Sequence, residues 1–222
     1  MMDSRFLIIA RVGDHSQHAH WLQGERPKFD LFINYTGATP ARFKDDGTFY
    51  EQSFYEPSLS GQSLSEQSQD SQDNKWPALA VLLASYWELI STYDAVWFPS
   101  DHLLTTSSDI NRLFHLFDGH QLALAEPVIS TEAKHTASLM RFVSGIGTIA
   151  PLFSRDNLAQ QKANFAHKQN NSQRAMTWSE QTPNPKRNQI AIIDAVSTID
   201  SSVDRNESLQ PAIELYGQYI FQ

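Results

Sequence analysis

The chain has 222 residues, 41% of them hydrophobic and 19% charged, with 17 basic and 25 acidic side chains and a formal charge of −8. This length can bury one sizeable core, so we expect a single domain over residues 1–222. The acidic balance makes nucleic acid a poor partner, because binding to a phosphate backbone depends on clustered Lys and Arg. The absence of cysteine excludes disulfides, zinc–thiolate sites and cysteine nucleophiles, and it fits a reducing compartment.

Two compact apolar runs in the first 35 residues are typical of buried strands. Residues 6–10 form the first run, and Arg11 interrupts it before it reaches the length of a signal peptide. Asp30–Tyr35 forms the second. The longest later apolar stretch, 78–90, contains polar residues and is shorter than the roughly 20 residues that a membrane span needs. We therefore expect a cytoplasmic protein without a membrane span.

Residues 57–74 differ in composition from the rest of the chain. Ser and Gln alternate there, and Leu59 and Leu64 are the large apolar residues of the segment. Such a stretch cannot bury enough apolar surface to offset the loss of conformational entropy on folding. We interpret it as a mobile loop within the single domain.

Two helices and four more strands are predicted after this loop. A helix can begin at Pro77, because apolar residues recur at helical spacing from there to Ile90. Ser107 or Ser108 can cap a second helix, which would run through Phe117. Short apolar runs predict strands at residues 93–98, 121–125, 147–153 and 189–196.

Strands that alternate with helices over the first 125 residues imply crossover connections. This predicts a single-domain α/β fold, with a mainly parallel central sheet flanked by helices. Ligands of such sheets bind beyond the carboxyl ends of the strands. Two polar segments stand directly after predicted strands, namely residues 11–14 and 100–102.

Several well-defined active-site motifs are absent from the sequence. It contains no phosphate-binding loop, no dinucleotide fingerprint and no Gly-x-Ser-x-Gly nucleophile elbow. The cluster of His15, His18 and His20 could supply imidazole ligands, but no carboxylate stands at a recognised metal-binding spacing from it. Ordinary surface or loop histidines are the favoured interpretation of this cluster.

Asp101 is the more specific candidate, because it follows an aromatic strand that Pro99 ends, and because His102 comes next. A carboxylate in this place could bind a divalent cation that bridges two phosphates. Alternatively, Asp101 accepts backbone N–H bonds in the turn before the next helix, and spacing alone favours this interpretation. Asp14 carries the same ambiguity between a loop cap and an acceptor for ribose hydroxyls.

Seven short segments of the sequence are informative because of their order along the chain. The fourth reads Tyr-Asp-Ala-Val-Trp-Phe-Pro-Ser-Asp-His-Leu. The full set consists of residues 11–14, 18–21, 29–35, 93–103, 122–127, 149–154 and 190–196. In this order they resemble the landmarks of an uncharacterised glycosyltransferase-like family, domain-of-unknown-function family 707, and the resemblance extends from about residue 6 to residue 200.

The resemblance implies a GT-A-like fold in which an acidic motif after a central strand binds a metal and the diphosphate of a nucleotide-sugar donor. The family motif reads Pro-Asp-Asp-Asp-Leu, whereas this chain has Ser100, Asp101 and His102 at the three acidic positions. Asp101 matches the middle acid, His102 could still ligate manganese, and Ser100 is a weak oxygen donor. Of a later Ser-Gly-Trp-Gly-Leu-Asp-Trp segment only Trp178 has a counterpart, and the family's histidine after the last strand is replaced near Asp200.

The same resemblance implies roles for the remaining candidates. Asp101, with His102, would hold Mn²⁺ or Mg²⁺ on the donor diphosphate. Asp14 and Asp30 would accept hydrogen bonds from the ribose or the base, and Arg11 would offset phosphate charge.

Other interpretations remain open. Without a metal, cationic side chains must stabilise the leaving diphosphate, and Arg11 and Lys75 stand nearest by motif position. The altered acidic motif favours a catalytically inactive relative that binds a sugar, a nucleotide or a protein partner. A metal-independent hydrolase with a lone acid is a third hypothesis. The sugar acceptor is not indicated by the sequence.

Overall fold

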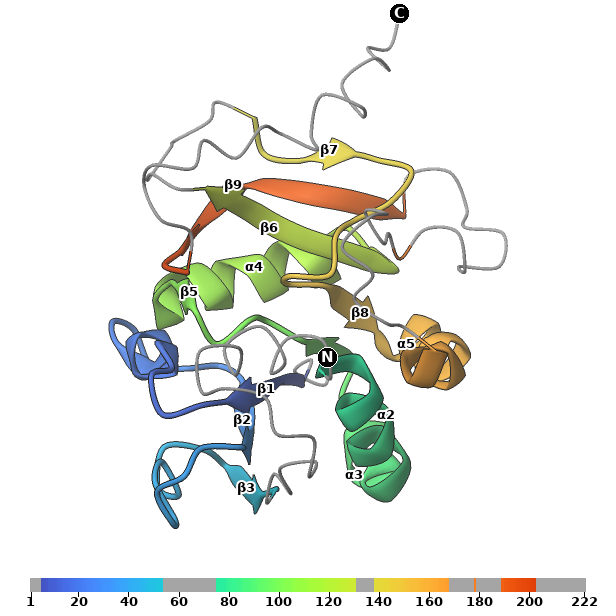
Figure 1. Cartoon of the computed structure of the whole chain (residues 1–222). Coiled ribbons are helices and arrows are strands. Elements are labelled where there is room, and N and C mark those ends of the chain that lie inside the picture. The colour runs from blue at the N-terminus through green and yellow to red at the C-terminus, as the bar shows by residue number, and fades with distance from the viewer. Residues whose placement is uncertain (1–4, 54–74, 131–137, 168–177, 179–188, 203–222) are drawn as a thin grey trace, which may run out of the picture.

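The computed structural model describes residues 5–53, 75–130, 138–167, 178 and 189–202, so the predicted loop at 57–74 lies outside the described residues. Nine strands among these residues form one sheet in the order β3-β2-β1-β4-β8-β6-β9-β5, with β7 paired to β9 (Figure 1). The strands are β1 (Phe6–Val12), β2 (Asp30–Tyr35), β3 (Phe49–Gln52), β4 (Ala95–Trp97), β5 (Leu103–Leu104), β6 (Leu124–Ser130), β7 (Arg141–Phe142), β8 (Leu152–Ser154) and β9 (Ile190–Asp200). The helices are η1 (His18–Leu22), α2 (Lys75–Ser85), α3 (Trp87–Ile90), α4 (Ser107–Gly119), α5 (Arg155–Gln161) and η2 (Lys162–His167).

Most of the described strands run in one direction. β1 pairs in parallel with β2 and β4, β2 with β3, and β6 with β9. β8 is antiparallel to both β4 and β6, so β4 and β6 share a direction, while β5 and β7 run antiparallel to β9. The predicted α/β fold with a mainly parallel sheet is therefore confirmed. The extent of a single domain over residues 1–222 and its GT-A type stay predictions.

One face of the sheet is covered by α4 and η1. Ile110, Leu113 and Phe114 of α4 share a buried cluster with Ile8 and Ala10 of β1. The spacing of the α4 residues, three and four apart, is the reason why this helix presents one apolar face to the sheet. Trp21 of η1 belongs to the same cluster, which fixes η1 against this face.

The other face is covered by α2, α3, α5 and η2, and Figure 1 shows α2, α3 and α5 grouped on a side of the sheet away from α4. Trp76, Leu79 and Leu83 of α2 share a second buried cluster with Leu7 and Ile9 of β1. Residues 7–10 are fully buried, as expected for a strand that is covered on both faces.

Several predicted boundaries are wrong. The helix expected from Pro77 to Ile90 is divided, because Tyr86 leaves the helical conformation (φ −115°, ψ 19°) between α2 and α3. Thr106, not Ser107 or Ser108, caps α4, since its side chain accepts a hydrogen bond from the Asp109 amide.

Three of the later strands also differ in their bounds. The expected strand at 121–125 begins only at Leu124, after Gln121 has taken a left-handed conformation (φ 52°). The strand expected over 147–153 shortens to β8, the strand at 93–98 shortens to β4, and the strand at 189–196 extends to the end of β9.

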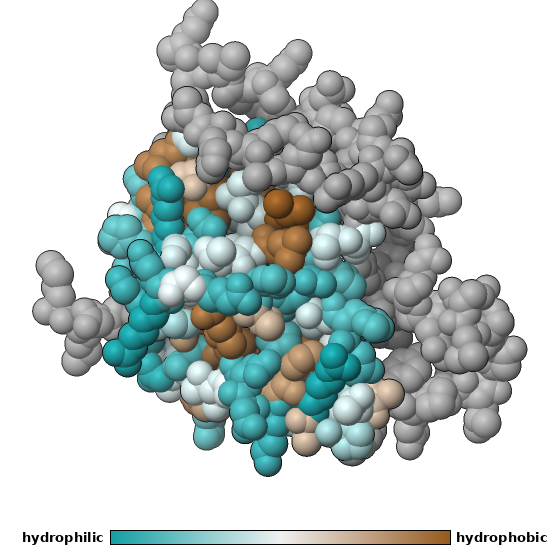
Figure 2. Space-filling model, turned by 90° about the vertical axis from the view of Figure 1, so that its left-hand side faces the viewer, coloured by the Kyte–Doolittle hydropathy of each residue, from teal (hydrophilic) through white to brown (hydrophobic). Residues whose placement is uncertain are grey.

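The described surface shows few apolar side chains. Val81, Leu139, Phe142 and Ile149 are the large hydrophobic residues that are exposed among the described residues. On the face in Figure 2, apolar side chains lie in small patches separated by polar ones. No helix in the described part of the chain is long and apolar enough to cross a membrane.

Candidate functional site

A cavity of about 330 Å³ lies at the carboxyl ends of β1 and β4. Proline at position 99 lacks an amide proton and cannot donate to a neighbouring strand, and β4 ends two residues before it. The segment after β4 stays anchored, because the amides of Phe98 and Ser100 donate to the carbonyls of Pro151 and Ile149. The described lining residues are Arg11, Gly13, Asp14, His15, Thr36, Lys75, Trp76, Pro99, Ser100, Asp101, His102, Thr148, Ile149, Asp200 and Ser202.

The cavity brings together all but one of the predicted site residues. The exception is Asp30, which begins β2 opposite Leu7 and therefore lies at the amino end of the parallel strands. Its carboxylate accepts hydrogen bonds from the Tyr93 hydroxyl (2.5 Å) and from Thr48 (3.2 Å). The members that line the cavity are Arg11, Asp14, Lys75, Asp101 and His102.

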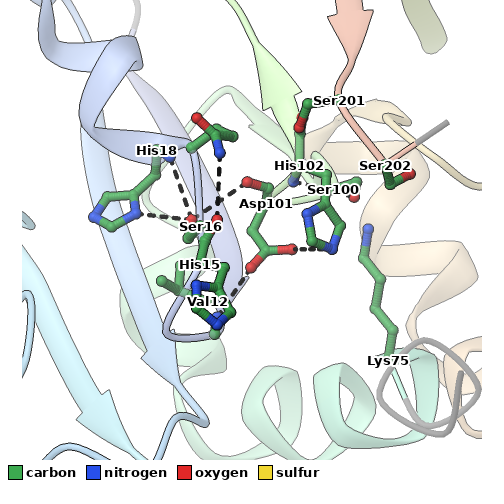
Figure 3. Close-up of polar contacts among 12 residues, drawn as sticks. Val12, His15, Ser16, His18, Lys75, Ser100, Asp101, His102, Ser201 and Ser202 are labelled. Atoms are coloured by element: carbon green, nitrogen blue, oxygen red, sulfur yellow. Dashed lines mark hydrogen bonds and ion pairs between the residues drawn. The ribbon is translucent and has the colours of Figure 1, made fainter. Parts of the chain in front are cut away.

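The two carboxylate oxygens of Asp101 have different neighbours. Its Oδ2 accepts a 2.9 Å hydrogen bond from the Gly13 amide, and its carbonyl accepts one of 2.7 Å from the Gln17 amide. Its Oδ1 lies 3.7 Å from His102 Nε2, and Figure 3 shows this pair beside the end of β1. Asp101 thus serves as a turn acceptor through one oxygen and faces an imidazole with the other.

Asp14 is a loop cap in this structure. Its Oδ1 accepts a 2.5 Å hydrogen bond from the Tyr35 hydroxyl and lies 3.4 Å from the Arg42 guanidinium, while its Oδ2 accepts one of 2.9 Å from the Ala38 amide. The Tyr35 hydrogen bond is the main reason why the pKa of Asp14 is lowered. The role of Asp14 toward a ribose stays a prediction.

Lys75 extends from the start of α2 into the space beside His102 and Ser202 (Figure 3). Its Nζ donates to the carbonyl oxygens of Phe98 (3.2 Å) and Ile149 (3.5 Å), and so joins the two segments of chain that form this wall. Burial lowers the pKa of Lys75 to about 8. The nearby Asp101 charge opposes this shift, and the Arg11 charge acts in the same direction as burial.

The three predicted histidine candidates are not close-packed around one point. His15 lines the cavity and His20 is exposed. His18 is fully buried between Ser16 and Asp46, so the interpretation as a surface or loop histidine is wrong for it. No group of three His, Asp or Glu side chains among the described residues could hold a metal ion.

Asp101 and His102 nevertheless fit a divalent cation as a partial ligand set. Asp101 Oδ1 and His102 Nε2 are one carboxylate oxygen and one imidazole nitrogen, which suits Mn²⁺. Ser100 contributes its hydroxyl to the turn, where it accepts a hydrogen bond from the His102 amide (3.4 Å).

Sequence reasoning missed part of the wall. Asp200 ends β9, is 9% exposed and accepts hydrogen bonds from the amide (2.9 Å) and the hydroxyl (2.6 Å) of Ser202. Thr36 follows β2 directly. Thr36 obeys the rule that ligands bind beyond the carboxyl ends of parallel strands, so this signal was present in the sequence. Asp200 lies four residues beyond the predicted end of its strand, so the same signal was absent for it. Nothing comparable in the sequence points to Thr148 or Ile149.

No family model matches the chain, and no curated protein matches it. Among solved structures, the chain is similar to a nucleotide-diphospho-sugar transferase candidate from Desulfovibrio desulfuricans G20, with 14% identity over 69% of this chain and 65% of that chain and a TM-score of 0.37. It is also similar to residues 1–349 of S. aureus TarS, with 10% identity over 89% of this chain and 60% of that chain and a TM-score of 0.47. The chain therefore spans less than two thirds of either structure, and the resemblance to family 707 stays a prediction.

Proposed function

We propose that the cavity binds the diphosphate of a nucleotide-sugar donor and that the chain is a glycosyltransferase-like protein with an unidentified acceptor. The observation that carries this proposal is the convergence of Lys75, Asp101 and His102 in one cavity at the carboxyl ends of two neighbouring parallel strands. This is the place where α/β sheets bind their ligands. The sequence motifs that resemble family 707 supply the donor class.

The charge of the lining supports a role for a cation. Arg11 and Lys75 contribute two positive charges, and Asp14, Asp101 and Asp200 contribute three negative ones, so the formal sum is 2 − 3 = −1 with histidines neutral. A diphosphate adds further negative charge, so a cation that accompanies it would strengthen binding in such a cavity. Asp101 and His102 would hold Mn²⁺ or Mg²⁺ there.

The chain's own residues would then act on the donor in distinct ways. Lys75, fixed by two carbonyl groups, can direct its remaining N–H toward a phosphate oxygen. Arg11 would offset phosphate charge from the end of β1. A bound cation would neutralise charge on the departing diphosphate.

A non-catalytic relative is the second candidate function. It is favoured by the Ser100 and His102 substitutions in the acidic motif and by the lack of a three-ligand group among the described residues. Such a protein would use the same cavity to bind a sugar or a nucleotide, or would bind a protein partner, without transferring a sugar.

The experiment that tests the metal-dependent proposal compares nucleoside diphosphate binding with and without Mn²⁺ in the native protein and in Asp101→Asn. The Asn side chain still accepts the Gly13 hydrogen bond but lacks the anionic oxygen, so we expect the fold to persist and the Mn²⁺ enhancement to disappear. Asp156→Asn, which neutralises an exposed carboxylate on α5, is the matched control and should retain the enhancement.

A gain-of-function variant completes this test. Restoring two carboxylates with Ser100→Asp and His102→Asp should strengthen the Mn²⁺ dependence, because hard divalent cations prefer oxygen ligands. If neither the native nor the restored protein shows Mn²⁺-dependent binding, with both folded by circular dichroism, the cation is not part of the site. The non-catalytic binding protein is then the better account.

A further inference from the structure

A buried histidine outside the cavity connects a surface carboxylate to the loop that holds Asp101. The side chain of His18 is fully buried, and both of its ring nitrogens have partners. Nδ1 lies 2.8 Å from Ser16 Oγ, and Nε2 lies 3.2 Å from Asp46 Oδ2. Asp46 comes from the segment between β2 and β3, so the contact joins two loops that are far apart in the sequence.

These atoms resemble a nucleophile, base and acid in their order, but the burial of His18 argues against that use. Ser16 is not among the described residues that line the cavity, and its hydroxyl oxygen is already engaged by His18. Ser16 Oγ also accepts a hydrogen bond from the His18 amide (3.3 Å), and its single proton can be donated either to His18 Nδ1 (2.8 Å) or to the Asp101 carbonyl (3.3 Å). The Ser16 hydroxyl is therefore a structural group that contacts both His18 and the Asp101 backbone.

The loop 13–17, which contains Ser16, makes hydrogen bonds to Asp101. At its two ends the amides of Gly13 and Gln17 donate to the Asp101 carboxylate and carbonyl, at 2.9 and 2.7 Å. His18 follows the loop directly and Ser16 lies within it. With Oδ2 of Asp101 committed to Gly13, the loop determines where Oδ1 points, and this atom faces His102.

The segment that supplies Asp46 carries a costly backbone conformation. Phe43 has a left-handed φ of 63°, which a bulky residue adopts only where its surroundings stabilise it. Its ring packs edge-on against His18, with the ring centroids 4.5 Å apart. Two contacts from one segment thus fix a single imidazole.

We propose that His18 and Asp46 are positioning residues for the Asp101 carboxylate and act on it through Ser16 and the loop 13–17. The proposal rests on the proposed function only for what Asp101 does with a ligand. An ionised carboxylate can only accept, so Asp46 keeps the proton on Nε2 and leaves Nδ1 to accept from Ser16. Without Asp46 the His18 ring loses its hydrogen-bond acceptor, and we expect the loop 13–17 to become more mobile.

The test uses three variants of the full chain without any ligand. Asp46→Ala removes the acceptor for His18 Nε2, Asp46→Asn restores a neutral acceptor, and Asp45→Ala changes an exposed carboxylate next to it in the same segment. Hydrogen exchange at the Gly13 and Gln17 amides reports whether they still hold Asp101. The Ala10 amide within β1 is the internal reference for global opening.

We expect Asp46→Ala to accelerate exchange at Gly13 and Gln17 about fivefold, the factor that corresponds to the loss of one hydrogen bond of roughly 1 kcal/mol, while exchange at Ala10 is unchanged. Asp46→Asn should return exchange to near the native rate, and Asp45→Ala should have no effect. Unchanged exchange at both amides in Asp46→Ala, or an equal acceleration at Ala10, would overturn the proposal. If Asp46→Ala does not fold, Ser16→Ala is subjected to the same comparison.

A second measurement separates this proposal from the proposed function. In the native protein and the same variants, binding of a nucleoside diphosphate with Mn²⁺ should weaken in Asp46→Ala, recover in Asp46→Asn and stay native in Asp45→Ala. If the native protein binds no diphosphate, the proposed function fails, while the exchange data still decide whether His18 and Asp46 position Asp101. If diphosphate binds equally well to all variants, the positioning role is contradicted.

Discussion

The Gly13 amide, directly after β1, donates a 2.9 Å hydrogen bond to Asp101 Oδ2, in the turn after β4. β1 and β4 are neighbours in the sheet, so this contact joins the ends of two parallel strands. It leaves Asp101 Oδ1 on the side of His102 and of the cavity. The parallel pairing of β1 with β4 therefore also brings Gly13 and Asp101 of the candidate site together.

A variant of Asp30 tests whether this residue stabilises the fold or binds the ligand. Asp30→Ala should destabilise the protein by about 1–2 kcal/mol, because the Tyr93 hydroxyl and Thr48 lose their acceptor. Diphosphate affinity should stay native, since Asp30 lies at the amino end of β2. Urea denaturation and calorimetric titration measure the two effects. A loss of affinity without a loss of stability would restore Asp30 to the binding site.

The lowered pKa of Lys75 predicts how diphosphate binding without a metal depends on pH. With its pKa lowered to about 8, Lys75 is a cation below that pH and becomes neutral above it. Affinity for a diphosphate should therefore fall as the pH rises through about 8, although a bound anion will move the fall somewhat higher. Titrations without metal between about pH 7 and pH 9.5 measure this fall.

Lys75→Met is the matched variant for the pH titration. It should bind more weakly at pH 7 and lose most of the pH dependence, because the titrating ammonium is gone. An identical pH profile in the native protein and in Lys75→Met would show that Lys75 does not meet the ligand.

Burial raises the pKa of Glu126 to about 7, and this carboxylate accepts a 3.1 Å hydrogen bond from the Gly147 amide beside the cavity wall. The folded protein then holds a proton that the unfolded chain releases from about pH 4.5 upward, so stability declines between about pH 4.5 and 7. Glu126→Gln keeps an acceptor without the charge. Its advantage over the native protein should grow to about 1–3 kcal/mol by pH 8 and be small at pH 5, as measured by urea denaturation. An advantage independent of pH would contradict the buried carboxylate.

Close packing in the loop that Asp14 caps predicts different effects of alanine at two glycines. A Cβ at Gly37 would come within 2.7 Å of Asp14 Cγ and would also overlap the Tyr35 hydroxyl, whereas a Cβ at Gly119 meets nothing within 4 Å. Gly37→Ala should therefore cost about 1–3 kcal/mol. Gly119→Ala should be neutral or stabilise by up to about 1 kcal/mol. Equal thermal stabilities of the two variants would contradict the close packing at Asp14.

The sequence predicted the bounds of β2 well and those of the short strands poorly. The expected bounds of β2, Asp30–Tyr35, are those observed, because a strand covered on both faces is a continuous apolar run with clear ends. β5 and β7 have two residues each, too few for any periodicity to be visible. The division between α2 and α3 depends on the backbone at Tyr86, which lies within an uninterrupted apolar stripe.

The candidate site was predicted where a polar residue follows a strand. Asp101 and Asp14 follow β4 and β1, and both line the cavity. Asp30 begins its strand, so the rule that ligands bind at carboxyl ends already argued against it. The contact between His18 and Asp46 was invisible in the sequence, because it depends on how two loops meet in three dimensions.

The central claim is that the cavity binds the diphosphate of a nucleotide sugar, and calorimetric titration of the native chain tests it most directly. A panel of nucleoside diphosphates and their sugars is titrated with and without Mn²⁺. We predict saturable binding with one ligand per chain for at least one nucleotide, tighter with Mn²⁺. No binding of any member of the panel under either condition, by a chain that circular dichroism shows to be folded, would contradict the claim.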